Sequence, residues 1–308
     1  MRAHEAGALH AEAGERGSAY RPSWLRPPTD VNALEPALWS HTARRRPDGV
    51  VEVGGVALTD LAAQFGTPAY VLDEVDFRRR AAAFRDAFSG FDVYYAGKAF
   101  MCSAVLRWVA AEGLHLDVCT GGELAAALRA GFDPARIGFH GNNKSPAELA
   151  RALDTGVGRI IVDSFTEIER LDRLAATRGV VAAVLVRATV GVEAHTHEYI
   201  ATAHEDQKFG FSIAEGDAFD AVRRVLASEH LRLLGLHSHI GSQIYDTAAF
   251  EVAARRVLDL HVAVRDELGT TCEELDLGGG FGIAYTTRDD PQTPAELARA
   301  LDTGVGRI

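Results

Sequence analysis

The sequence of 308 residues predicts an α/β fold built on a parallel sheet. From about residue 68, short β-branched or aromatic runs alternate with helix-period segments rich in Ala, Leu and Arg. Polar and glycine-rich residues follow the strands, where open α/β sheets and α/β barrels both place their sites. Hydrophobic residues make up 47% of the chain, enough for a full core. The rhythm leaves two architectures open, a doubly wound sheet and a closed barrel.

The predicted elements alternate along the chain. The expected strands are Ala69–Leu72, Val93–Ala96, Leu116–Cys119, Ile137–His140, Ile160–Val162, Ala183–Val186, Leu233–His237 and Leu275–Leu277. The expected helices are Ser103–Ala111, Gly122–Ala130, Pro146–Leu153, Glu167–Ala176, Asp217–Ala227 and Ala248–Leu268.

Composition excludes several classes of protein. The net charge of −11 argues against nucleic-acid binding, and the short runs Arg44–Arg46 and Arg78–Arg80 are interpreted as solvated charge. The first thirty residues lack the apolar stretch of a signal peptide, and no segment has the roughly 18 apolar residues of a spanning helix. Three cysteines without metal-ligand spacing indicate free thiols in a reducing cytoplasm.

The last fifteen residues, Pro294–Ile308, repeat Pro146–Ile160 letter for letter. A structural repeat shows loose similarity across a whole unit, whereas this identity covers one helix and the start of one strand. We interpret the segment as a duplication or an assembly accident, and a natural repeated helix is the alternative.

Lysine is scarce, with three lysines among the 32 Lys and Arg residues. Lys can lose its proton and form a Schiff base, which Arg cannot do. Lys98 follows the strand Val93–Ala96 through Gly97, so its side chain is expected at the carboxyl end of the sheet. A lysine in a salt bridge is the plain alternative. Lys144 and Lys208 have no role that the sequence identifies.

Two later motifs could hold a ring and an anion. His237 and His239 share one face of an extended segment, and Ser242 follows Gly241. An imidazole there could stack on a planar ring, with zinc binding as the runner-up, although a third ligand is lacking. The run Gly278, Gly279 and Gly280 follows a strand and could bring backbone N–H groups to a phosphate, the alternative being a flexible turn.

Two other strand ends carry polar side chains. Asp117 could orient the lysine or a histidine, or serve as a turn residue, and His140 ends the next strand with donors toward the same edge. Histidines at 195, 197 and 204 are irregularly spaced in a polar loop, so we expect no metal there.

Taken together and in this order, the motifs YYAGKAF, HGNNK, DQKFGF, HSHIGSQ and LDLGGGFG resemble the diaminopimelate decarboxylases. These belong to the alanine-racemase-type (fold III) decarboxylases that use pyridoxal 5′-phosphate, and the resemblance runs from about Asp48 to Thr287. It implies that Lys98 is the Schiff-base lysine and that His239 stacks on the pyridine ring. The remaining cofactor-binding residues would be Asp117, His140, Ser242, Gly278, Gly279 and Gly280.

The resemblance also implies a domain organisation. Residues 76–290 would form a (β/α)₈-type barrel that lacks its last strand, and residues 48–75 a remnant of an N-terminal β-domain segment that includes Ala69–Leu72. Residues 1–47 would be a poorly ordered leader and 291–308 the duplicated tail. The family's Glu-Pro-Gly-Arg motif does not occur, nor does the C-terminal β-domain with its Cys-Glu-Ser motif, which family members contribute across a homodimer.

The implied reaction converts meso-diaminopimelate to L-lysine and CO₂ in the cytoplasm. We expect weak or no turnover, because the carboxylate that faces the pyridine nitrogen in the family is missing. The alternatives are a non-enzymatic fragment that binds pyridoxal phosphate, and a relative that acts on ornithine or arginine. A racemase or a cofactor-homeostasis protein would lack the pairing of HGNNK with HSHIGSQ.

Overall fold

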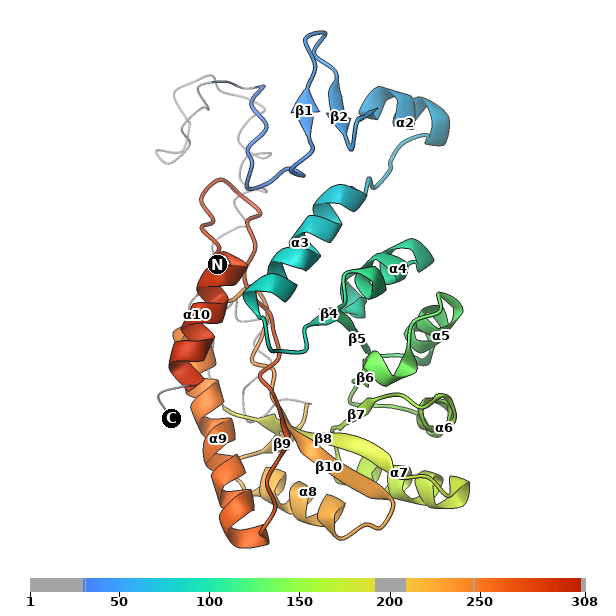
Figure 1. Ribbon diagram of the computed structural model, residues 1–308, viewed down its shortest axis with the longest axis vertical. Coiled ribbons are helices and arrows are strands. Elements are labelled where there is room, and N and C mark those ends of the chain that lie inside the picture. Colours follow the sequence, from blue (N-terminus) through green and yellow to red (C-terminus); the bar gives the residue numbers. More distant parts are fainter. Residues whose placement is uncertain (1–29, 31, 192–208, 246, 306–308) are drawn as a thin grey trace, which may run out of the picture.

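A curved parallel sheet forms the body of the molecule in the computed structural model, which describes residues 30, 32–191, 209–245 and 247–305. Seven strands follow one another in the spatial order β11-β10-β8-β7-β6-β5-β4, with β9 paired to β8, and each pairing is parallel. The predicted barrel that lacks a strand is therefore confirmed as a half-barrel (Figure 1). The strands are β4 (Tyr94–Ala96), β5 (His115–Val118), β6 (Ile137–Phe139), β7 (Arg159–Val162), β8 (Ala182–Thr189), β9 (Phe211–Ser212), β10 (Leu231–His237) and β11 (Glu274–Asp276).

Helices cover the outer face of this sheet (Figure 1). Most of them contribute fully buried side chains to one apolar layer, for example Leu106, Leu124, Leu149, Leu171 and Val222. They are α3 (Glu74–Ala87), α4 (Ser103–Ala111), α5 (Gly121–Arg129), α6 (Pro146–Thr155), α7 (Phe165–Arg178), α8 (Asp217–Leu226), α9 (Ala248–Leu268) and α10 (Pro294–Val305), with 3₁₀ turns η2 (Gly97–Ala99) and η3 (Pro134–Arg136).

The strand-to-helix turns are short because polar side chains start the helices at once. Thr120 and Ser145 each accept a hydrogen bond from the backbone of a glutamate three residues later, and that glutamate reaches back to the cap. Ser164 caps α7 through the N–H of Glu167. Each helix begins within a few residues of its strand, and this keeps the carboxyl ends of β5, β6 and β7 in one rim.

The concave face of the sheet is apolar in the middle and charged at the amino ends of the strands. Ile161, Leu185 and Leu234 pack together in the interior. Arg159, the first residue of β7, makes a two-pronged ion pair with Glu274 on β11, with N–O distances of 2.5 and 2.7 Å. Its guanidinium is also 3.5 Å from Asp92, just before β4. One arginine thus links the regions of both outer strands.

The amino-terminal part forms a small antiparallel sheet above the half-barrel (Figure 1). Its strands are β1 (Arg44–Arg45), β2 (Val51–Val53) and β3 (Val56–Ala57), followed by α2 (Leu58–Phe65). Because β1 precedes residue 48 and pairs with β2, this sheet begins earlier than the expected boundary. Residues 1–29 of the expected leader lie outside the described residues.

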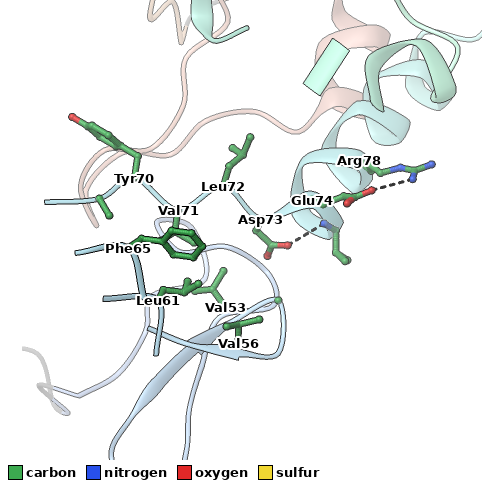
Figure 2. Close-up of a pocket in the computed structure, with 13 residues that line it drawn as sticks. Val53, Val56, Leu61, Phe65, Tyr70, Val71, Leu72, Asp73, Glu74 and Arg78 are labelled. Carbon is green, nitrogen blue, oxygen red and sulfur yellow. Dashed lines mark hydrogen bonds and ion pairs between the residues drawn. The ribbon is translucent and has the colours of Figure 1, made fainter. Parts of the chain in front are cut away.

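The strand predicted at Ala69–Leu72 is wrong, because these residues belong to no strand. Their apolar side chains line a groove of about 780 Å³ together with Val53, Leu61 and Phe65 (Figure 2). Tyr70 is fully exposed there and Phe65 is 71% exposed. None of the residues that line this groove comes from the half-barrel's strands. Among the described helices, none combines the length and the apolar character that a membrane crossing requires.

Candidate cofactor site

Lys98 lies in η2, directly after β4, and its side chain is exposed at the carboxyl end of the sheet. A side chain at the preceding residue would not fit, because a Cβ on Gly97 would lie 2.6 Å from the Met101 sulfur and 2.7 Å from the Asp117 carbonyl oxygen. The Lys98 charge contributes to lowering the pKa of His239, after burial, the main cause. The two side chains are therefore close enough for the Lys98 charge to act on His239, although β4 and β10 lie far apart in the sequence.

Asp117 and His140 meet on the neighbouring strands. Asp117 is on β5 and His140 follows β6, with 3.1 Å between the carboxylate Oδ1 and the imidazole Nε2. Gly138 leaves room for this carboxylate, since a Cβ there would lie 2.7 Å from Asp117 Oδ1. An acid and a histidine therefore lie side by side at this rim.

The two histidines of the HSHIGSQ motif have different surroundings. His237 is buried, and its ring packs edge-on against His140 with centroids 5.0 Å apart. Burial lowers the pKa of His237 well below its ordinary value, helped by the nearby His140 and Arg187. For His239, burial and then the Lys98 charge lower the pKa to about 3. Both imidazoles are therefore neutral near pH 7, and a neutral His239 ring is suited to stacking on another flat ring.

The glycine run after β11 is fixed by an acid. Asp276 Oδ1 accepts a hydrogen bond from the Gly278 N–H at 2.7 Å, and desolvation, followed by repulsion from Asp117, raises the pKa of Asp276 to about 6. Gly278 and Gly280 have φ values of 70° and 100°, which favour glycine. A Cβ on Gly280 would lie 1.9 Å from the Gly241 carbonyl oxygen, whereas a Cβ on Gly279 would have no atom within 4 Å.

The loop that carries Ser242 packs against this run. A Cβ on Gly280 would also lie 3.2 Å from the Ser242 Cα, so the two segments touch through backbone atoms. Ser242 is exposed and Gly279 borders open space. The structure thus joins Ser242 to Gly278–Gly280 at one end of the rim.

Sequence reasoning missed a second set of charges beneath the rim. Arg187 is a buried guanidinium on β8 and approaches Asp163 to 3.4 Å, and the other oxygen of Asp163 accepts the Gly210 N–H at 2.7 Å. Arg187 was detectable as the one charged residue in an otherwise apolar strand, Ala182–Thr189. Its pKa is lowered by burial despite the Asp163 carboxylate.

Lys144 is also part of the buried structure. Its ammonium is 2.8 Å from Glu167 and donates to the Gly141 and Ile161 carbonyl oxygens at 2.6 and 2.7 Å. Burial raises the pKa of Glu167, and Lys144 opposes that rise. This lysine therefore fixes the turn after His140, and its charge does not reach solvent. Lys208 and the histidines at 195, 197 and 204 lie outside the described residues.

His140, His237 and Asp276 could in principle hold a metal, since their ligand atoms lie within 4.8 Å of one another. Two positively charged side chains lie near this cluster, because the charges of Arg187 and Lys144 both lower the pKa of His237. A divalent ion would be repelled by those charges, and Asp117 already lies against His140. We therefore assign these three residues to a polar cluster under the rim.

These residues fit a phosphorylated pyridine aldehyde. An exposed amine, a neutral imidazole and a glycine cradle with open space at Gly279 occupy one rim. In addition, His237 Nδ1 and Ser238 Oγ are buried without a hydrogen-bond partner among the described residues. Lys98 is the amine that could carry the aldehyde, His239 the ring that could stack on it, and Ser242 with Gly278–Gly280 the anion site.

Comparison with known families agrees with this composition. The family model described as "Pyridoxal-dependent decarboxylase, pyridoxal binding domain" matches residues 74–308. The chain belongs to this family of pyridoxal-dependent decarboxylases, whose matched domain is the one that binds pyridoxal phosphate.

Within the family, the similarity to diaminopimelate decarboxylases is confirmed. The enzyme of Mycobacterium tuberculosis is 58% identical over 275 residues, which are 88% of this chain and 62% of that protein. The Bacillus subtilis enzyme is 48% identical over 264 residues, 84% of this chain and 60% of that protein. A crystal structure of the M. jannaschii enzyme with L-lysine superimposes with a TM-score of 0.81 at 31% identity, covering 88% of this chain and 64% of that one. The chain thus spans about three fifths of the length of these relatives.

Proposed function

We propose that the chain forms the cofactor-binding barrel of a diaminopimelate decarboxylase, which releases CO₂ from meso-diaminopimelate to give L-lysine. The observation that carries the proposal is that Lys98, His239 and the Gly278–Gly280 run lie at one rim, after strands β4, β10 and β11. Identity of 58% to the M. tuberculosis enzyme supports diaminopimelate as the substrate over ornithine or arginine.

Pyridoxal 5′-phosphate, when bound, supplies an electron sink for the bond electrons left behind by the departing carboxylate. The residues of this chain hold and orient. The amine of Lys98 would hold the cofactor's aldehyde, and the imidazole of His239 would stack on one face of its ring. Because His239 is neutral, it adds no charge to that face.

The acids and histidines below the rim contact one another. Asp117 lies against His140, and His140 against His237, so these groups form a continuous row across β5, β6 and β10. This row keeps Asp117 beside the lysine-bearing end of β4. The paired charges of Arg187 with Asp163 and of Lys144 with Glu167 fix the loops on the same side. Such positioning is the protein's part in cofactor chemistry.

The substrate and the compartment are part of the same proposal. We infer a small amino-acid substrate and a cytoplasmic location, which the three free cysteines, Cys102, Cys119 and Cys272, support. The homodimer and the weak turnover expected from the sequence stay predictions. Analytical ultracentrifugation and release of labelled CO₂ from meso-diaminopimelate are the measurements that test them.

Covalent attachment is the sharpest test of the proposed site. The purified chain is incubated with pyridoxal phosphate, reduced with borohydride and digested, and the modified peptide is identified by mass spectrometry. We expect the label on Lys98. The variants K98A and K98R should lose both the label and the absorbance of the attached aldehyde, with K98R controlling for charge. A label on Lys144 or Lys208, or unchanged absorbance in K98A, would contradict the assignment.

A further inference from the structure

The loop after β10 contains an unusual backbone conformation. Gln243 has a φ of 57°, and among the described residues it is the one non-glycine residue with a positive φ. Residues other than Gly, Asn and Asp rarely adopt a positive φ, because their Cβ crowds the backbone. Such a conformation persists where surrounding contacts determine it, and it is then a reason to ask what the residue does.

The side-chain amide of Gln243 binds the backbone of one residue twice. Its Oε1 accepts from the Ile283 N–H at 3.0 Å, and its Nε2 donates to the Ile283 carbonyl oxygen at 3.0 Å. A residue on a neighbouring β-strand would make the same pair of hydrogen bonds with the Ile283 backbone. The Tyr245 hydroxyl donates to the same carbonyl oxygen at 2.7 Å. Only an amide can make both bonds at once, because a carboxylate has no donor.

These bonds join the two segments that contain the anion site. Ile283 follows the run Gly278–Gly280, and Gln243 follows Ser242 directly. Backbone bonds complete the joint, since the Ile244 N–H donates to the Gly280 carbonyl oxygen and the Gly282 N–H donates to the Ile244 carbonyl oxygen, both at 2.9 Å. The side chain of Gln243 therefore adds a second row of bonds beside this short bridge.

We propose that Gln243 is a positioning residue that holds the Gly241–Ser242 segment against Gly278–Gly280, so that both present their hydrogen-bond donors to the phosphate of the cofactor. This inference rests on the proposed function, because it takes pyridoxal phosphate as the occupant. It assigns the amide a task separate from the ring and the amine: it sets the spacing of the anion site. A residue that merely stabilised the loop would affect binding of every part of the cofactor alike.

The experiment compares two aldehydes that differ only in the phosphate. Dissociation constants for pyridoxal phosphate and for pyridoxal are measured by absorbance titration of the 308-residue chain and of the variants Q243E and Q243G. Q243E removes the donor and places a carboxylate against a carbonyl oxygen. Q243G removes the amide but suits the positive φ, so it keeps the fold. Q292E, the same change in an exposed loop residue, is the matched control.

We expect the wild-type chain to bind pyridoxal phosphate more tightly than pyridoxal. In Q243E and Q243G this preference should fall about tenfold, with pyridoxal affinity changed less than about twofold, and Q292E should retain the preference. An unchanged preference in Q243G, or an equal loss for both aldehydes, would overturn the inference alone. If the wild-type chain bound neither aldehyde, the proposed function would fail and this inference with it.

Discussion

Helices α6 and α10 begin with the same ten residues, PAELARALDT, in two different surroundings, and α6 ends at Thr155 whereas α10 continues to Val305. Helix α6 lies between α5 and α7 on the outside of the sheet, whereas α10 packs against α3 and α9 at the open side of the half-barrel (Figure 1). In both places the helix begins at the equivalent proline, Pro146 or Pro294. The shared sequence therefore carries enough information to start a helix in either position.

The start is alike because the capping chemistry is alike. Ser145 precedes α6 and Thr293 precedes α10, and each accepts from the backbone of a glutamate, Glu148 or Glu296, that bonds back to it. Burial is different. Ala152 is buried in α6, and its counterpart Ala300 is only half-buried. Local sequence determines where these helices begin, and the neighbouring elements determine how much each contributes to stability.

Proline at equivalent positions of the two helices should give the largest difference in stability. A150P and A298P replace the same residue of the same sequence, and an interior proline costs about 3 kcal/mol or more. We expect A150P to lose cooperative folding. A298P should lower stability less, because α10 can unfold locally while the sheet stays intact. Urea unfolding followed by circular dichroism measures both, and equal losses would mean that α10 folds as one unit with the barrel.

Leucine truncation should give a smaller contrast. Leu149 is fully buried in the main core and Leu297 is 4% exposed on the outer helix layer. We expect L149A to cost about 2–5 kcal/mol, within the range for core leucines, and L297A to lie at or below the bottom of that range. Chemical denaturation of both variants checks the order. A larger loss in L297A would show that α10 belongs to the core.

The capping glutamates should give the smallest contrast, and it depends on pH. Glu148 accepts bonds from Ser145 and also from the Gly121 N–H at 2.7 Å, whereas the Glu296 carboxylate, among the described residues, accepts bonds from Thr293. Hydrogen bonds from Ser145, before all other causes, lower the pKa of Glu148. Its carboxylate therefore stabilises the fold above about pH 4.5, and this contribution is lost as the pH falls further.

E148Q should accordingly cost about 1 kcal/mol at pH 7, and the difference from wild type should shrink toward pH 3. E296Q should have a smaller effect over the same range. Thermal melting between pH 3 and 7 measures both variants. A cost in E148Q that did not change with pH would show that charge plays no part in this cap.

The sequence predicted the barrel's alternation well, because apolar runs and capped helices are local patterns. Ser103–Ala111 and Ala248–Leu268 begin and end as expected. The prediction failed where contacts with other parts of the chain determine the local structure. Ala69–Leu72 is rich in strand-forming residues, yet among the described residues no strand pairs with it. Helix α3 was not among the predicted helices, because its arginine run was interpreted as solvated charge on either a helix or a loop.

The candidate site shows the same division. Lys98, His239 and Gly278–Gly280 could be identified because each follows a strand and together they match an order of motifs. Arg187 and Asp163 could not be paired, because Arg187 is on β8 and Asp163 follows β7, and their approach depends on how the sheet curves. The role of Gln243 likewise depends on a bond to Ile283, forty residues away in the chain.

The burial of Lys144 has a practical consequence for proteolysis. A lysine-specific protease can cut this chain at only three positions, after Lys98, Lys144 and Lys208. The Lys144 side chain is 1% exposed and paired with Glu167. The peptide bond after it also begins the cap of α6. Cutting there requires the middle of the barrel to open, whereas exposed Lys98 can be reached in the native state. The rate of cleavage at Lys144 therefore reports the opening of the barrel without any added label.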